Sequence, residues 1–565
     1  MRKTSSSLWY GALAGGLLTA PLMSVLYLGQ ELADLPFMPF TLFDWFTRVL
    51  PGPLITFGLD TMISLFLALG ISIADTGKLA EQTMAVLMFW LLGTLTGSLF
   101  FVGLRVAHRV RAVVLAGLVP GAFVGLPLVA IDVVIGQSSL PGWVRVLWLA
   151  LVFLAWGVAL GWCHYRLLPA TAAATATIAT PPAEAPEPRT VERIDRRTFL
   201  IKLGASSATI TLIGAGAGSL LATRRSSEPA PDGQTRTDDD DGDTGGKSDR
   251  GTGTPETPPF PNADDLVQPV LGTRPEYTPI QDHYRVFIRT QTTRIDGESW
   301  RLPVTGLVER PLMLSLDDIR TNYEAMEQYV TIACISGRIP TDLIGTTLWT
   351  GVSVQDVLAD AGVQDGAQHL FITSGDGFYE TVPLDLIRQD RRIMFAYAWD
   401  RRPLPVDHGY PLRIWIPNRY GMKQPKWITG VEVVSDYRPG YWVERGWSRE
   451  AVMHAWSFID TVAVDSMMED GGRRLVPIGG IAFAGDRGIS SVEVRVNDGP
   501  WEQAQVREPL SETTWAIWRY EWPFQEGEHT FAVRCTDGNG DLQVTEPGDP
   551  RPDGSTGIHT VTRTF

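Results

Sequence analysis

VTIACISGRIPTDLIGTTLWTGVSVQDVL, residues 330–358, contains Cys334, one of the three cysteines in a chain of 565 residues. The β-branched residues before Cys334 predict a strand, and the run from Ser336 to Pro340 predicts a loop. A second strand pattern ends near Gly351, and Val354–Ala361 has the periodicity of a helix. By itself, a cysteine at the end of a strand is most often a packed thiol. The other reading is that Cys334 binds a ligand, and the rest of the chain decides between the two.

The composition divides the chain into two unlike halves. Residues 1–165 are almost wholly apolar, whereas residues from 263 onward have the mixed composition of an enzyme-sized globular region. The net charge of −15 argues against a nucleic-acid-binding surface. Three cysteines, Cys163, Cys334 and Cys535, cannot form a disulfide framework, so they leave the compartment undecided.

Residues 1–165 are predicted to form an all-α membrane domain, because a span needs about 20 mostly apolar residues. Five segments meet this requirement: Leu8–Leu28, Pro53–Ile73, Met84–Leu104, Val113–Ile135 and Val144–Cys163. The segment Leu35–Val49 is too short to span and is predicted to lie at the interface or to be re-entrant. The lipid bilayer is therefore an expected partner.

A sixth apolar segment, residues 194–223, begins with Arg196-Arg197-Thr198-Phe199-Leu200 and continues into a mild Ala/Gly/Ser-rich core. This pattern resembles a twin-arginine translocation signal, which exports folded proteins with their cofactors in place. The alternative is a plain span with flanking arginines on the cytoplasmic side. The basic loops around Arg109 and before Arg197 both favour the cytoplasm, so the C-terminal half is expected on the extracytoplasmic side of the cytoplasmic membrane. Residues 224–262, rich in Asp, Gly, Pro and Thr, are predicted to be a disordered acidic linker.

The remaining residues alternate short strands, turns and short helices, which indicates an α+β region followed by an all-β region. We expect strands at Trp300–Val304, His369–Thr373 and Leu412–Ile416, and a helix capped near Ser315. In this setting a zinc site would need more Cys or His at metal-ligand spacing. A single thiolate instead suits a metal held mainly by another ligand set, such as molybdenum held by a pterin dithiolene.

The residues around Cys334 resemble the molybdopterin domain of the sulfite oxidase family. The phrases "IGTTLWTGV", "LPVDHGYPLR" and "KWI" occur in the family's order and at plausible spacing. Residues 263–450 are accordingly expected to form the α+β molybdopterin-binding domain. Residues 451–565, with short alternating strands and Gly/Asp turns, resemble the family's immunoglobulin-like sandwich, through which homodimers are expected.

The resemblance implies roles for individual residues. Cys334 matches the cysteine that ligates molybdenum. The residues expected to hold the molybdenum–molybdopterin cofactor are Arg289, Thr290, Gln291, Ser374, His408, Arg413, Gln424, Pro425 and Lys426. Arg445 and Trp447 are expected at the catalytic pocket, with Arg438 and Arg449 as further candidates for a basic anion pocket.

The sequence departs from the family pattern at two places. Gly337 stands where many members have asparagine, and Trp447 stands where sulfite oxidases have a tyrosine. Because an indole donates only through its N–H and has no phenolic proton, this difference leaves the substrate open.

The resemblance implies a molybdopterin-dependent oxidoreductase that transfers an oxygen atom to sulfite or a related small oxyanion. The alternatives are an S-oxide reductase of the same fold and a non-catalytic, membrane-tethered binding module. The sequence contains no C-x-x-C-H haem motif, so a separate electron-transfer partner is expected.

Overall fold

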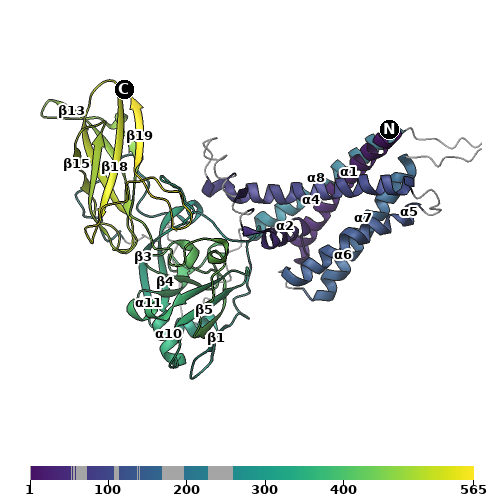
Figure 1. Ribbon diagram of the computed structural model, residues 1–565, viewed down its shortest axis with the longest axis horizontal. Coiled ribbons are helices and arrows are strands. Elements are labelled where there is room, and N and C mark those ends of the chain that lie inside the picture. Colours follow the sequence, from purple (N-terminus) through teal and green to yellow (C-terminus); the bar gives the residue numbers. More distant parts are fainter. Residues whose placement is uncertain are drawn as a thin grey trace, which may run out of the picture. The chain divides into compact units, whose positions relative to one another are not determined.

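The computed structural model describes the chain apart from residues 1, 53, 55–56, 59–60, 62–72, 107–112, 137, 139, 168–195 and 227–258. The chain divides into two compact units, Met1–Pro51 with Lys78–Pro229 and Gly52–Gly77 with Ala230–Phe565 (Figure 1). The first unit is helical, and the second contains every strand that the structure describes. Most of the predicted linker, residues 227–258, lies outside the described residues.

The first unit consists of helices. In chain order they are α1 (Arg2–Ala33), α2 (Met38–Val49), α4 (Ile73–Val106), α5 (Val113–Ala116), α6 (Leu118–Ile135), α7 (Gly142–Leu167) and α8 (Arg196–Ser226). Their shared core is built from large apolar side chains such as Phe89, Phe153 and Trp156. The predicted interfacial segment, residues 35–49, contains the 12-residue helix α2.

Five helical segments in the described part of the chain are long and apolar enough to cross a membrane. They are Leu8–Ala33, Thr76–Leu104, Val114–Ile135, Gly142–Leu167 and Arg197–Leu221. Four coincide with predicted spans, and the fifth is the segment with the twin arginines. The predicted span Pro53–Ile73 lies mostly outside the described residues.

Two five-stranded sheets make up residues 302–434. The first has the order β2-β1-β10-β5-β6, in which β1 and β10 are parallel and the other neighbours antiparallel. The second has the order β3-β4-β7-β8, with β9 paired to β7. The strands are β1 (Leu302–Gly306), β2 (Leu312–Leu314), β3 (Ala325–Ala333), β4 (Ile344–Ser353), β5 (His369–Ser374), β6 (Tyr379–Pro383), β7 (Met394–Trp399), β8 (Arg402–Pro403), β9 (Arg413–Trp415) and β10 (Ile428–Val434).

Both sheets and three helices share one core. The helices are α9 (Leu316–Asn322), α10 (Val354–Ala361) and α11 (Leu384–Gln389). Buried residues from the first sheet (Ile372, Val431) and the second (Val352, Phe395) belong to the same apolar cluster. Helix α9 begins with a capping box, in which Ser315 Oγ accepts from the Asp318 backbone N–H at 3.0 Å. This confirms the predicted cap near Ser315.

The first predicted strand of this region is shifted by two residues. Residues 300–304 were expected to be extended, but β1 spans Leu302–Gly306. Trp300 instead lies before the strand, buried, with its indole N–H donated to the Ile428 carbonyl at 2.9 Å. The register of β1 is decided by its pairing with β10 and by which of its alternating side chains become buried. The sequence of residues 300–306 alone does not show where this pairing begins.

The C-terminal residues form two further antiparallel sheets packed around one core (Figure 1). One has the order β11-β13-β17-β16 with β12 on β13, and the other the order β15-β14-β18-β19. The strands are β11 (Trp456–Val462), β12 (Met468–Asp470), β13 (Arg473–Phe483), β14 (Ile489–Val496), β15 (Trp501–Gln503), β16 (Gln505–Val506), β17 (Ala516–Pro523), β18 (Glu528–Asp537) and β19 (His559–Thr564).

The two sheet regions are joined by hydrogen bonds and by a shared apolar cluster. The loop before β17 continues the edge of β3, because the Thr331 N–H donates to the Thr513 carbonyl and the Ser511 hydroxyl donates to the Tyr329 carbonyl. A cluster with members from both regions, including Ala333 and Trp515, closes the junction. The segment that contains Cys334 therefore begins where the two regions meet.

Candidate cofactor-binding site

Cys334 directly follows β3 and opens the loop that leads to β4. Its backbone N–H donates to the Leu343 carbonyl at 2.9 Å, which holds the base of the loop closed. The sulfur is partly buried and lies 3.1 Å from the Ser336 hydroxyl. Burial raises the pKa of the Cys334 thiol, while the Ser336 hydrogen bond and the Lys426 charge act in the opposite direction. The thiol is therefore placed on a loop, not within the apolar core of a strand.

The Cys334 loop is held from the C-terminal region. The Ser555 hydroxyl donates to the Gly337 carbonyl at 2.6 Å, and Arg338 forms an ion pair with Asp549 at 2.9 Å. A β-carbon at Gly337 would lie only 2.8 Å from Thr341 Oγ1. This close approach explains why glycine occupies the position where many family members have asparagine.

A group of basic side chains, three of them buried and one half-buried, packs around the aromatic cluster on which Cys334 lies. The rings of His283 and His408 are 5.4 Å apart, and the Trp399 ring packs against both. The Arg413 guanidinium lies 4.2 Å from the centre of the Trp349 ring and donates to the His408 carbonyl at 3.0 Å. We call His283, His408, Arg413 and Lys426 the basic cluster.

Lys426 joins this cluster through the backbone. Residues 425–428 run beside residues 409–414, with hydrogen bonds from the Ile414 N–H to the Pro425 carbonyl and from the Ile428 N–H to the Leu412 carbonyl. Gly409 has φ +116°, and a β-carbon there would lie 3.1 Å from the Lys426 side chain. Pro425 and Lys426 are thereby brought next to the segment that carries His408 and Arg413.

The basic cluster contains the buried Arg413, which forms no ion pair with the described residues. Burial lowers the pKa of Arg413 to about 9 and that of His283 to about 3. Burial also lowers the pKa of His408 well below its usual value, and the charges of Lys426 and Arg413 lower it further. Because a buried charge costs free energy unless it is paired, an anionic group that binds here stabilises the charged form of Arg413.

Several buried polar atoms around the cluster have no hydrogen-bond partner among the described residues. They include Arg413 Nε, His283 Nε2, Ser374 Oγ and Gln424 Oε1. A buried donor or acceptor costs free energy unless it is paired. Guanidinium, hydroxyl and amide groups are suited to bind a phosphate and the polar edge of a pterin. The residues present therefore fit a phosphorylated pterin.

The segment that contains Arg289, Thr290 and Gln291 also lies at this site. Arg289 and Thr290 are buried, Gln291 is half-buried, and Arg289 Nε donates to the Asp376 carbonyl at 2.9 Å. Asp376 lies in the turn between β5 and β6, two residues after Ser374. The same turn donates the Gly375 N–H to the Trp427 carbonyl at 2.8 Å. The turn thus connects the segment of Arg289 to that of Lys426.

Arg445 and Trp447 occupy different surroundings. Trp447 packs on the cluster that contains Ile335, the residue after Cys334. Arg445 lies 3.6 Å from the centre of the Tyr441 ring and donates to the Tyr441 carbonyl at 2.6 Å. The structure therefore brings Trp447 toward the Cys334 loop, whereas these contacts of Arg445 lie within its own segment.

Sequence reasoning missed three residues that shape the site. His283, which lies six residues before Arg289, is not among the residues that the sequence predicted for the site. Ser555 and Asp549, which hold the Cys334 loop, are more than 200 residues away in sequence, and nothing in their local sequence marks them.

The chain is similar in sequence to known proteins. A family model described as "oxidoreductase molybdopterin binding domain" matches residues 289–442. The chain is 32% identical over 152 residues to the uncharacterized oxidoreductase YuiH of Bacillus subtilis, covering 27% of this chain and 74% of that protein. It is 25% identical over 287 residues to mitochondrial sulfite oxidase of Homo sapiens, covering 43% and 52%. It is 26% identical over 324 residues to the NAD(P)H nitrate reductase of Hordeum vulgare, covering 46% and 36%.

Among solved structures, the sulfane dehydrogenase SoxCD from Paracoccus pantotrophus is similar at 20% identity and a TM-score of 0.43, covering 48% of this chain and 78% of that one. That overall score is too low to carry a structural conclusion. The chain spans about half the length of the human enzyme and about a third of the barley enzyme.

The fold and the site define a molybdopterin-dependent oxidoreductase. The chain belongs to the sulfite oxidase family of molybdenum enzymes, and its cofactor is molybdenum–molybdopterin.

Proposed function

We propose that this chain is a membrane-anchored oxygen-atom-transfer enzyme in which Cys334 is the protein ligand of molybdenum. The observation that carries the proposal is the basic cluster beside Cys334, in which the buried Arg413 charge has no acidic partner among the described residues. Trp349 links the two parts, since Cys334 packs on the apolar cluster that contains Trp349 and the Arg413 guanidinium lies on the Trp349 ring. A thiolate on one side and a phosphate-binding group on the other match the two ends of the cofactor.

Each residue has a part in holding the cofactor. The Cys334 thiol loses its proton on ligation, because the thiolate is the metal-binding form. The Ser336 hydroxyl, 3.1 Å away, then donates a hydrogen bond to the sulfur. Arg413, Lys426 and His408 bind the phosphate. The remaining contacts to the pterin come from Arg289, Thr290, Gln291, Ser374, Gln424 and Pro425.

When bound, the cofactor supplies the two-electron exchange of an oxygen atom. In the direction of sulfite oxidation, sulfite and water become sulfate, two protons and two electrons. The electrons pass to a separate partner protein. Trp447 packs on the cluster that contains Ile335, next to Cys334 in the chain. Its indole N–H has no partner among the described residues and is proposed to donate to a substrate oxygen. Arg445 is proposed to line the same pocket.

The remaining parts of the chain are proposed to anchor and assemble the enzyme. Five apolar helices hold it in the cytoplasmic membrane, with the catalytic half on the extracytoplasmic side. The twin arginines at the start of α8 direct export after cofactor insertion. Residues 263–450 form the molybdopterin domain, and residues 451–565 form an immunoglobulin-like domain that supports a homodimer. The two antiparallel sheets around one core support this last assignment.

Metal content tests the proposal. Full-length protein purified in detergent from a host that makes the cofactor is expected to contain one molybdenum per chain. Cys334→Ser is expected to lose the metal, whereas Cys535→Ser, in the core of the C-terminal sheets, is expected to keep it. Wild-type protein without molybdenum would contradict the proposal. Parallel assays of sulfite oxidation and sulfoxide reduction then identify the reaction direction.

A further inference from the structure

A buried ion pair lies directly beside the residues proposed to hold the pterin. Lys423 Nζ is 2.6 Å from Glu380 Oε1, and the two side chains are only 5% and 0% exposed. Burial raises the pKa of Glu380, and the neighbouring Lys423 charge opposes this shift. The pair lies outside the basic cluster, and the mechanism above does not use it.

Lys423 ends the short 3-10 helix Gly421–Lys423 and is followed at once by Gln424, Pro425 and Lys426. The Gln424 amide donates to the Arg419 carbonyl at 2.9 Å, and the Pro425 carbonyl accepts from the Ile414 N–H. The position of Lys423 therefore determines where the next three residues lie relative to Arg413.

Glu380 lies on β6 and connects three segments. Its Oε1 also accepts from the Thr381 N–H at 2.8 Å. A β-carbon at Gly440 would collide with the Glu380 carboxylate, so the backbone of the third segment packs directly on it. That segment continues to Trp447 and is paired with β6 through the Tyr441 N–H and the Tyr379 carbonyl.

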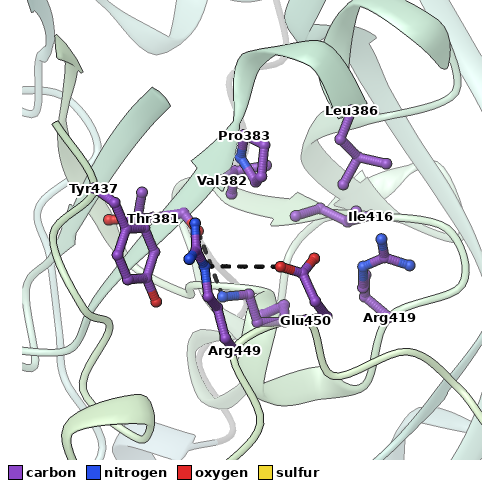
Figure 2. A pocket seen from close by; sticks show the side chains of 10 residues that line it. Thr381, Val382, Pro383, Leu386, Ile416, Arg419, Tyr437, Arg449 and Glu450 are labelled. Atoms are coloured by element: carbon purple, nitrogen blue, oxygen red, sulfur yellow. Dashed lines mark hydrogen bonds and ion pairs between the residues drawn. The ribbon is translucent and has the colours of Figure 1, made fainter. Parts of the chain in front are cut away.

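A small hollow lies against Lys423 and is bordered by Thr381, Tyr437 and Arg449 (Figure 2). Arg419 and the Arg449–Glu450 ion pair also line it. Arg449, which the sequence predicts as a candidate for the anion pocket, lines this hollow.

A buried ion pair is weak support for stability by itself, because desolvation of both charges offsets their attraction. Well-packed apolar residues often stabilise a fold as well or better. A buried ion pair that joins a ligand-binding segment to two other segments is better explained by a role in positioning. Its two charges must stay in contact, so the segments that carry them are held in one arrangement.

We propose that Lys423 and Glu380 are positioning residues that set the register of residues 424–426 against the cofactor. The proposal rests on the function proposed above, in which these three residues hold the pterin. Neither side chain touches the cofactor; each acts through the backbone of the segment that it holds.

The test measures cofactor retention in full-length holoenzyme in detergent. Molybdenum per chain is followed during dialysis for wild type, Glu380→Gln, Lys423→Met and Lys423→Arg. Glu380→Gln and Lys423→Met are expected to release molybdenum about tenfold faster than wild type, or more. A tenfold change corresponds to a loss of only about 1.4 kcal/mol in the free energy that holds the cofactor. Lys423→Arg, which keeps the positive charge opposite Glu380, is expected to release molybdenum as slowly as wild type. The Mo(V) EPR signal of the metal that remains is expected to shift in the first two variants and not in the third.

The double variant Glu380→Leu/Lys423→Met separates positioning from plain stability. It is expected to unfold at the wild-type temperature when free of cofactor and still to release molybdenum rapidly. Asp385→Asn, which removes an exposed ion pair with Arg388 in the next helix, is the matched control and is expected to behave as wild type.

Two outcomes overturn the inference: wild-type retention in Glu380→Gln and Lys423→Met, or full recovery of retention in the double variant. If the double variant does not fold, the comparison of Lys423→Arg with Lys423→Met decides, and equal release from the two overturns the inference. Wild-type protein without molybdenum would instead refute the proposed function, so the two failures are distinguishable.

Discussion

Arg413, which we propose to bind the cofactor, is expected to destabilise the protein when the cofactor is absent. It is 5% exposed, and its buried charge is met mainly by the Trp349 ring and one carbonyl. Its lowered pKa means that the folded chain holds this proton less tightly than the unfolded chain does. At any pH below about 9 the charged Arg413 therefore lowers the free energy of unfolding of the cofactor-free protein.

Arg413→Met is expected to have opposite effects on the empty and the loaded protein. Cofactor-free variant, from a host that cannot make molybdopterin, is expected to unfold about 3 °C higher than wild type, because an uncompensated buried charge is removed. Variant from a cofactor-competent host is expected to contain little molybdenum. Calorimetry and metal analysis measure the two effects.

The control is Arg310→Met, since Arg310 is exposed and pairs with Asp360 at the surface. It is expected to change neither quantity. A cofactor-free Arg413→Met that is less stable than wild type would mean that Arg413 stabilises the fold by itself.

At the scale of elements, α8 packs along α1 through small residues and side-chain hydrogen bonds. The Ser24 hydroxyl donates to the Thr211 carbonyl at 3.3 Å, and the Ser207 hydroxyl donates to the Leu17 carbonyl. A β-carbon at Gly214 would lie 2.9 Å from Ser24 Cβ, whereas one at Gly216 meets nothing within 4 Å. This contact indicates that the segment with the twin arginines is a permanent helix of the membrane unit.

Cysteine cross-linking tests whether α8 stays with α1. In a chain without the three native cysteines, Ser24→Cys with Gly214→Cys is expected to form a disulfide in membranes. Ser24→Cys with Gly216→Cys is expected not to, because that position faces away from α1. A protease site inserted within residues 168–195 allows detection, since only the cross-linked fragments stay together on a non-reducing gel. A mature protein that lacks α8 would contradict the prediction.

At the scale of the whole molecule, residues 259–565 have hydrophobic cores of their own. Their first segment, residues 262–276, is bound to the C-terminal sheets. The segment from Asn262 to Glu276 is bound by Arg507, which pairs with Glu276 at 2.6 Å and donates to the Asn262 carbonyl at 2.8 Å. Arg274 binds Asp460 at 2.8 Å. Because Arg507 is only 6% exposed at its side chain, loss of this segment would leave a buried charge unpaired.

The fragment 259–565 is expected to fold in buffer without detergent and to contain molybdenum when made in a cofactor-competent host. A shorter fragment, 277–565, is expected to unfold about 6 °C lower, because the partners of Arg507 are missing. Size-exclusion chromatography, metal analysis and thermal unfolding measure these outcomes. Aggregation of fragment 259–565 in buffer would show that the catalytic half needs the membrane unit to fold.

Local sequence predicted some elements well and others poorly for identifiable reasons. Helix α10 has the predicted bounds Val354–Ala361, because Ser353 caps its start and Gly362, at φ +69°, ends it. The predicted strand at 412–416 is β9, shortened to Arg413–Trp415. The start of β1 was missed because its register depends on β10, more than 120 residues away.

The same division applies to the candidate site. By itself the sequence determined which residues have the chemistry for a molybdenum–pterin site: Cys334, His408, Arg413 and Lys426 stand in motifs whose order and spacing are local properties. Tertiary structure alone decided what surrounds them, including His283 against His408, Ser555 on the Cys334 loop, and Glu380 beside Lys423. The physical reason is that burial, charge compensation and hydrogen-bond pairing depend on neighbours in space, and a motif contains only neighbours along the chain.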